Sequence, residues 1–169
     1  TFLNNIPSDT SSSVVEVMLG EKEFKAGLNA NVGAIDIAET NEGDILTLLG
    51  QSLPSQPSNL QLIKTDSLFK PKWTLSFPAS DHSLRSIEKN IDGTFIISGN
   101  FLAGAQNIYS ISKIDKDGNL LWQKTYPSYS GVVIRARQSI DGGYLMIGSS
   151  DRVTPGGSTY TYTRVLKTD

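Results

Sequence analysis

The side chains that could carry out chemistry are few and scattered along the chain. The only histidine, His82, lies in the run Ser80 to Ser83 (SDHS), and there is no cysteine. A Ser-His-Asp triad converges from separate segments of a fold, so three such residues side by side predict a surface loop and not a triad. A zinc site needs three or four ligands, which one histidine without cysteine does not provide. We therefore expect neither a zinc centre nor thiol chemistry.

Two other segments contain part of a ligand-binding pattern. Asp115 to Asn119 (DKDGN) begins like a calcium-binding loop, but the glutamate at the twelfth position of such a loop is absent. Thr154 to Ser158 (TPGGS) is rich in glycine, but it lacks the lysine of a phosphate-binding turn. We expect both segments to be turns, and we expect no metal ion, no cofactor and no enzymatic activity.

Charge and hydropathy argue against two classes of partner. The net charge is -2 and the sequence pI is about 5.4, so there is no basic field to attract nucleic acid. No apolar run approaches the roughly 18 residues that cross a bilayer. The chain begins with Thr1 and not Met, which indicates that a leader or tag has been removed. A lipid anchor would then lie outside these residues.

The elements that position these side chains recur along the sequence. The glycines that close three apolar runs, Gly50, Gly99 and Gly148, are 49 residues apart. The same spacing separates Trp73 from Trp122. A fixed period in this range is typical of repeat architectures. Charged residues make up only 19% of a chain rich in Ser, Thr, Gly and Asn, which favours short strands joined by polar turns.

Each repeat predicts up to four strands. Trp73, Leu75 and Phe77 alternate with polar residues, as in a half-buried strand, and Asp-Gly pairs supply the positive-φ positions of tight turns. The third repeat lacks a fourth strand. The expected strands span 34–38, 45–49, 60–63, 73–77, 84–89, 95–98, 108–114, 120–126, 132–138, 144–147 and 159–166.

The repeats define the expected organisation of the chain. We expect an extended N-terminal arm at 1–13 and one repeat domain at 14–169. That domain consists of a partial unit (14–32) and three repeats (33–82, 83–131 and 132–169). Phe24 in the partial unit stands about where a Trp would fall if the repeat were extended backward.

The segment ISKIDKDGNLLWQKTY resembles the repeat of quinoprotein-like (PQQ-type) β-propellers, in which an Asp, a Gly and a Trp close each blade. Asp115, Gly118 and Trp122 fill these positions, whereas the first repeat keeps Asp66 and Trp73 without a glycine between them, so a different turn is expected there. The segments DGGYLMIGSS and VLKTD resemble tandem repeats of large secreted or surface proteins, many of them lipoproteins, of Bacteroidetes-type bacteria.

This resemblance implies an all-β fold of propeller blades, each a four-stranded repeat of about 49 residues. Propellers close with four to eight blades, and only three are present here. Either the native chain is longer, or several copies assemble into one ring, or the repeats form another fold, of which the β-trefoil is the main alternative. PQQ chemistry would require a complete ring with cofactor-stacking and metal-binding groups, and these are not visible in the sequence.

The resemblance further implies a non-catalytic binding or scaffolding module of a bacterial cell-envelope complex, at the outer membrane surface, in the periplasm or secreted. Its protein partner, for example an outer-membrane complex, would bind one rim of the propeller. The expected rim loops are 52–59, 78–83, 101–107, 127–131 and 151–158. Candidate contact residues are His82, Phe101, Tyr129, Arg152 and, on an innermost strand, Arg135, which aligns with Asp36 and Ser86. Alternatives are a glycan-binding surface protein and a hydrolase or lyase that uses two rim carboxylates.

Overall fold

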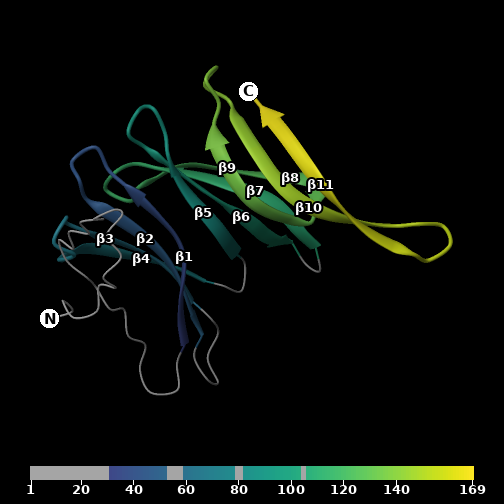
Figure 1. Ribbon diagram of the computed structural model, residues 1–169, viewed down its shortest axis with the longest axis horizontal. Helices are drawn as coiled ribbons and strands as arrows, with labels where there is room; N and C mark the ends of the chain where they lie inside the picture. Colours follow the sequence, from purple (N-terminus) through teal and green to yellow (C-terminus); the bar gives the residue numbers. More distant parts are fainter. Residues whose placement is uncertain (1–30, 53–58, 79–81, 104–105) are drawn as a thin grey trace, which may run out of the picture.

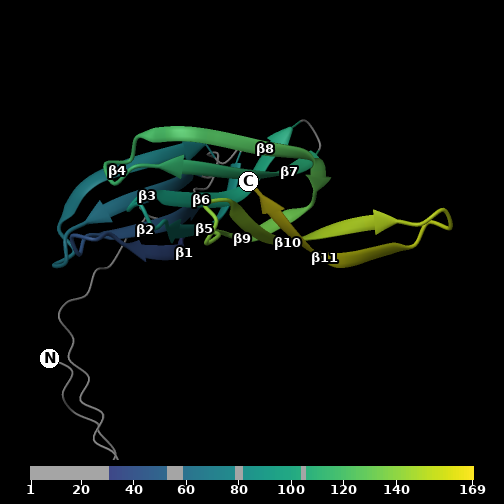
Figure 2. The ribbon, with the colours of Figure 1, turned by 90° about the horizontal axis from the view of Figure 1, so that it is seen from above.

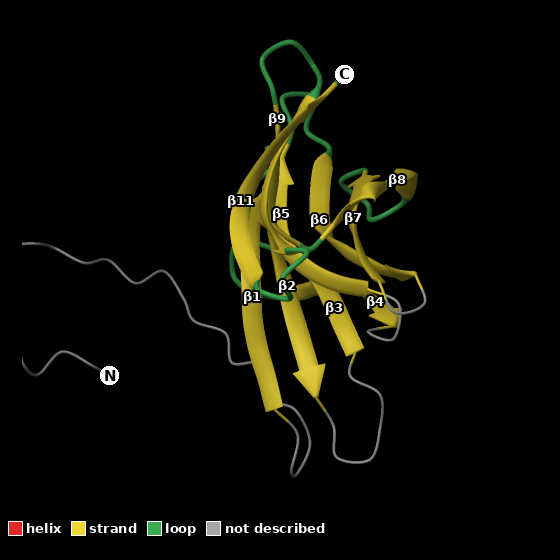
Figure 3. Cartoon of the chain, turned by 90° about the vertical axis from the view of Figure 1, so that its right-hand side faces the viewer, coloured by secondary structure: helices red, strands yellow, loops and turns green. Residues whose placement is uncertain are grey.

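The computed structural model describes residues 31–52, 59–78, 82–103 and 106–169, and within these ranges it contains eleven β-strands and no helix (Figures 1 and 3). The all-β fold class is therefore confirmed. The expected arm at 1–13 lies outside the described residues, as does nearly all of the partial unit. The strands are β1 (Asn31–Glu39), β2 (Ile45–Ser52), β3 (Asn59–Thr65), β4 (Pro71–Pro78), β5 (His82–Lys89), β6 (Phe95–Ala103), β7 (Gln106–Ile114), β8 (Leu120–Ser130), β9 (Val132–Gln138), β10 (Tyr144–Val153) and β11 (Thr159–Thr168).

The strands form three antiparallel sheets that follow one another along the sequence. Sheet 1 has the order β1-β2-β3-β4, sheet 2 the order β5-β6-β7-β8, and sheet 3 the order β9-β10-β11. The first strands lie next to one another, because β1 contacts β5 and β5 contacts β9. The hairpin of β10 and β11 projects away from the rest of the molecule (Figures 1 and 2). No closed ring is formed by the described residues.

Every one of these expected strands is present, and three strands extend furthest beyond the ends that their sequence patterns indicate. β6 runs to Ala103, β8 to Ser130 and β10 to Val153. Backbone pairing carries β6 and β10 past the glycines that close their apolar runs, with β6 paired to β7 and β10 paired to β11. In β8 the register against β7 shifts after Tyr126, and pairing is found again at Ser130. The described parts of the expected rim loops at 101–107 and 127–131 therefore consist largely of strand, whereas in the segment 151–158 only the residues up to Val153 are strand and the rest is a turn.

The same five-residue turn joins the first two strands of each sheet. The amide of Gly43, Gly93 or Gly142 donates to the carbonyl three residues earlier, and each glycine has a positive φ of 78° to 89°. Glycine adopts this conformation without the steric conflict that a side chain would bring. These turns fix the register of the first two strands in each sheet.

The turn before the fourth strand corrects one expectation. Asp115 accepts hydrogen bonds from the amides of Asp117 and Asn119, with Gly118 at a φ of 87°. Asp66 accepts the equivalent bonds in sheet 1, and Phe69 takes the place of the glycine with a φ of 60°. The first repeat thus has the same turn without the glycine, and the Asp side chain holds a non-glycine residue in the left-handed region.

Two clusters of buried side chains join the sheets. Between sheets 1 and 2 the core contains Leu46, Leu48, Leu60, Leu62, Leu84, Ile87, Phe95, Ile97 and Ile114. Between sheets 2 and 3 it contains Ile96, Ile111, Ala136, Tyr144 and Met146. Trp122 of β8 packs edge-on against Tyr144 of the next sheet, with ring centroids 5.4 Å apart. Aromatic residues on fourth strands therefore help to join one sheet to the next.

Candidate functional site

A β-bulge recurs at one position in the first strand of all three sheets. In β1 it lies between Ala34 and Asp36, and in β5 between Leu84 and Ser86. In β9 the register against β10 shifts between Val133 and Arg135. A bulge bends its strand and re-aims the neighbouring side chains. As a result Asp36, Ser86 and Arg135 occupy equivalent positions opposite Leu48, Ser98 and Ile147, as the sequence alignment predicted.

These first strands bring three charged side chains together. Arg135 contacts Asp36 through Nη2 at 3.5 Å from Oδ2, and it contacts Glu88 through Nη1 at 3.3 Å from Oε1. The Oδ2 atom of Asp36 also accepts the amide of Ile87 at 3.0 Å. One side chain from each sheet thus contributes to a single ion-pair cluster. Sequence reasoning missed Glu88, although it lies two residues after Ser86 and therefore on the same face of β5.

The cluster has the geometry of a joint between sheets. Asp36 and Glu88 contact the same guanidinium, and neither lines the cavity described below. No group of three or more His, Asp or Glu side chains within the described ranges is arranged to hold a metal ion. Arg135 is half exposed, so these ion pairs are partly screened by solvent.

The other four candidate contact residues lie at one end of the sheets. His82 begins β5 and pairs with Phe101 of β6, which in turn pairs with Ile108 of β7. Tyr129 lies near the end of β8, next to the residue that pairs with Ile108. Phe101 is half-buried, while of His82 and Tyr129 only the backbone is described. Arg152 lies near the end of β10, the equivalent end of sheet 3.

Buried polar groups fix sheet 3 at this end of sheet 2. The Asn100 side chain, 2% exposed, donates to the carbonyl of Gly131 and accepts the amide of Val133 at 3.1 Å. The hydroxyl of Tyr109 donates to the carbonyl of Ser149 at 3.1 Å. Burial raises the pKa of Tyr109, so this phenol stays protonated and keeps its donor at neutral pH. The strand ends that carry the candidate residues therefore have a fixed spacing.

The projecting hairpin adds an aromatic and basic face that sequence reasoning missed. Arg152 and Ser150 of β10 pair with Tyr160 and Tyr162 of β11, so these side chains share one face of the hairpin. Arg164 on the same face donates to the hydroxyl of Tyr162, and hydrogen bonds from Ser150 and Arg164 lower the pKa of that phenol. The alternation of Thr with Tyr and Arg in the segment TYTYTR is the sequence signal from which this shared face could have been predicted.

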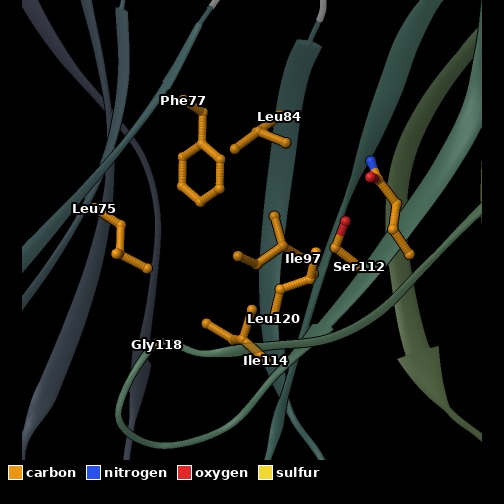
Figure 4. A pocket seen from close by; sticks show the side chains of 9 residues that line it. Leu75, Phe77, Leu84, Ile97, Ser112, Ile114, Gly118 and Leu120 are labelled. Carbon is orange, nitrogen blue, oxygen red and sulfur yellow. The ribbon is translucent and has the colours of Figure 1, made fainter.

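An apolar cavity of about 190 Å³ lies between sheets 1 and 2 (Figure 4). Figure 4 shows Leu75 and Phe77 of β4 on one side and Ile97 and Ile114 of sheet 2 on the other. Ser112 and Gln123 are the polar side chains in its lining. The volume is below the roughly 300 Å³ at which small-molecule sites usually begin. We interpret the cavity as a packing gap between sheets.

No protein-family model matches this sequence, and no curated protein matches it. Within the part of the chain that the structure describes, no helix is long and apolar enough to span a membrane.

Proposed function

We propose that this chain is a β-propeller repeat module that binds a protein partner and performs no catalysis, in the envelope of a bacterial cell. Its three sheets are the propeller blades, and the end of the sheets that carries His82, Phe101, Tyr129 and Arg152 is the rim to which the partner binds. The observation that carries the proposal is the position of these four residues, from four strands of sheets 2 and 3, at one end of the fold.

The chemistry of this rim fits a protein partner. Tyr and Arg are enriched among the residues that dominate binding energy at protein interfaces. Arg152 is joined on its face of the hairpin by Tyr160, which is exposed, and by Tyr162 and Arg164. The hydrogen bonds that Asn100 and Tyr109 donate to the carbonyls of Gly131 and Ser149 hold the neighbouring strands in place, which lowers the ordering cost of binding.

The hydrolase or lyase alternative needs two carboxylates that converge, and the ion-pair cluster brings Asp36 and Glu88 to the same guanidinium. Both contact Arg135, and the described cavity lies elsewhere. Acid-base hydrolysis needs the two carboxyl groups to flank a bound substrate. The carboxylate pair therefore fits a joint between sheets better than it fits a catalytic site.

Site-specific photo-crosslinking in the source cell tests the proposal. A photoreactive phenylalanine analogue replaces Phe101 at the rim, and as a matched control it replaces Ile140, which is exposed in the turn at the opposite end of sheet 3. We expect one discrete crosslinked protein from position 101 and none from position 140, and we expect Arg152→Glu to reduce its yield. Equal crosslinking from both positions, or none from the rim, would overturn the rim assignment.

A further inference from the structure

The projecting hairpin of β10 and β11 has one face that continues from the core between sheets 2 and 3 (Figure 2). The two strands pair without a register shift, so the even-numbered residues of both strands share this face. At the base of the hairpin it contributes Tyr144 and Met146 to the core with sheet 2. A Cβ on the next residue of this face, Gly148, would lie 2.6 Å from the hydroxyl oxygen of Tyr109, so Tyr109 of sheet 2 packs directly against this glycine. The face that leaves the core is therefore the inner face of sheet 3.

Beyond Gly148 this inner face is exposed and carries two phenols and two guanidinium groups. Tyr160 is 57% exposed and Tyr162 is 37% exposed. Arg164 lies over the ring of Tyr162, 5.3 Å from its centroid, and donates to its hydroxyl. Arg152 is exposed and pairs across the hairpin with Tyr160. We call Arg152, Tyr160, Tyr162 and Arg164 the hairpin face.

Charge is divided between the two faces of the hairpin. Asp151 is the only acidic residue in β10 and β11. It lies on the opposite face, where it accepts a hydrogen bond from the Thr161 hydroxyl at 2.6 Å. Within the described ranges Arg152 forms no ion pair. The two strands therefore place no carboxylate beside the cations of the hairpin face.

Both guanidinium groups act on one phenol of this face. Hydrogen bonds from Ser150 and Arg164 lower the pKa of Tyr162, and the positive charges of Arg164 and Arg152 lower it further. The potential around the Tyr162 hydroxyl is thus positive, although the net charge of the whole chain is -2. Complementary charge gives an interface its specificity, so this face favours a negatively charged partner group.

We propose that the hairpin face binds an acidic segment of the protein partner, with its two guanidinium groups paired to carboxylates and its two phenol rings packed against the chain between them. The inference rests on the partner binding proposed above and names the chemistry of that partner. A guanidinium presents two parallel N–H groups to a carboxylate, and Tyr and Arg are enriched among the residues that dominate binding energy at protein interfaces. Two guanidinium groups match a short acidic segment, whereas a polyanion such as nucleic acid would require a broad basic field.

Photo-crosslinking from the hairpin face in the source cell tests the inference. The photoreactive phenylalanine analogue replaces Tyr160, and as a matched control it replaces Thr163, which is exposed on the opposite face of β11. We expect position 160 to capture the protein that position 101 captures, and we expect mass spectrometry to place the crosslink in a peptide rich in Asp and Glu. Capture of a glycan or a lipid, of a peptide without acidic residues, or of the same protein from position 163 would contradict the inference.

A binding titration with that peptide, made synthetically, measures the part played by charge. Arg152→Gln and Thr163→Glu each lower the net charge by one, and both positions are exposed, so neither change should affect the fold. We expect Arg152→Gln to weaken binding about tenfold and Thr163→Glu to leave it within about twofold. Equal weakening by the two variants would show that net charge alone matters, and would refute a role for the hairpin face.

The outcomes separate this inference from the rim proposal. A discrete partner that crosslinks from position 101 but not from position 160 would remove the hairpin assignment and leave the rim proposal intact. No discrete crosslink from either position would remove both.

Discussion

The ammonium of Lys64 lies 3.2 Å from a carboxylate oxygen of Asp44, and the two side chains are only 6% and 9% exposed. Lys64 also donates to the carbonyl of Lys116 at 2.9 Å, in the turn of sheet 2 that precedes β8. The equivalent lysines of the other sheets also bind an aspartate of the first turn: Lys113 binds Asp92 and Lys167 binds Asp141. These two aspartates precede the turn glycine, whereas Asp44 follows it, and they are about half exposed. A lysine of the third strand thus pairs with the first turn in all three sheets, but the pair is buried only in sheet 1.

This difference in burial predicts unequal costs for removing the carboxylate. Asp44→Asn leaves the buried Lys64 ammonium without its counter-charge, and loss of one partner of a buried pair costs about 3 kcal/mol. Asp141→Asn should change the free energy of unfolding little, because the exposed pair is screened by solvent. Urea denaturation of both variants checks the order, and an equal loss in the two would contradict it.

The same carboxylates predict how stability depends on pH. The hydrogen bond from Lys113, followed by that from Thr94, lowers the pKa of Asp92 to about 2, and Lys167 likewise lowers the pKa of Asp141 to about 2. A carboxylate with a depressed folded-state pKa stabilises the fold above its unfolded pKa, near 3.9, and this stability is lost as the pH falls toward the folded value.

We therefore expect the free energy of unfolding to be flat from about pH 7 to pH 5 and to decrease between about pH 4 and pH 2. In the double variant Asp92→Asn with Asp141→Asn, the decrease should be slightly shallower, because these two groups no longer titrate but solvent screens both exposed ion pairs. Urea titrations at a series of pH values measure both curves. Parallel curves for the two proteins would show that other groups set the acid limit.

The strands were predictable because their signals are local. Apolar runs such as FIIS and YLMI, the alternation around Trp73, and the Asp-Gly turns each act over a few residues. Even the bulged position could be aligned, since Asp36, Ser86 and Arg135 fall into register once one residue is inserted. What the local signals did not reveal was the extent of β6 and β10, whose ends are held by pairing with a neighbouring strand, and of β8, which continues through a register shift.

Contacts between sheets were likewise beyond local reasoning. The partnership of Arg135 with Glu88 depends on how β5 and β9 lie beside each other, and no spacing in the sequence encodes that. The turn around Phe69 gave a wrong expectation for a related reason. A glycine was taken to be necessary there, but the Asp66 side chain supplies enough hydrogen bonds to hold a left-handed phenylalanine.

The glycine spacing gives a third prediction. Gly50 and Gly99 are 49 residues apart in the sequence, but they are not equivalent in the structure. Gly99 lies opposite Leu84 in sheet 2, and at the corresponding position of sheet 1 the residue opposite Ala34 is Leu49. A Cβ on Gly99 would lie 2.2 Å from the carbonyl oxygen of Ser83 and 2.8 Å from the Cα of Leu84. A Cβ on Gly50 would meet its nearest atom, in the Ile35 side chain, at 3.6 Å.

Gly99→Ala should therefore force the backbone of β5 away and cost about 3 kcal/mol, the upper part of the usual overpacking range. Gly50→Ala should be tolerated within about 0.5 kcal/mol, because its contact is ordinary and the substitution stiffens the unfolded chain. Thermal unfolding of the two variants tests whether the strand register, and not the 49-residue spacing, determines which glycine cannot be replaced. If both are damaged equally, the two glycines are equivalent after all.

The two tryptophans should respond differently to replacement by phenylalanine. The indole Nε1 of Trp73 is buried and has no hydrogen-bond partner in the described part of the chain, and an unsatisfied donor costs about 1–3 kcal/mol. Trp73→Phe removes that donor while it removes ring area, so the two effects offset and the net change in the free energy of unfolding should stay within about 1 kcal/mol.

Trp122 differs, because its indole nitrogen is not among the buried polar atoms without a hydrogen-bond partner in the described part of the chain. Its edge contact with Tyr144 and its cation–π contact with Lys124 should make Trp122→Phe more costly, by about 1–2 kcal/mol. Chemical denaturation followed by the fluorescence of the remaining tryptophan measures both. A larger loss for Trp73→Phe than for Trp122→Phe would contradict this account.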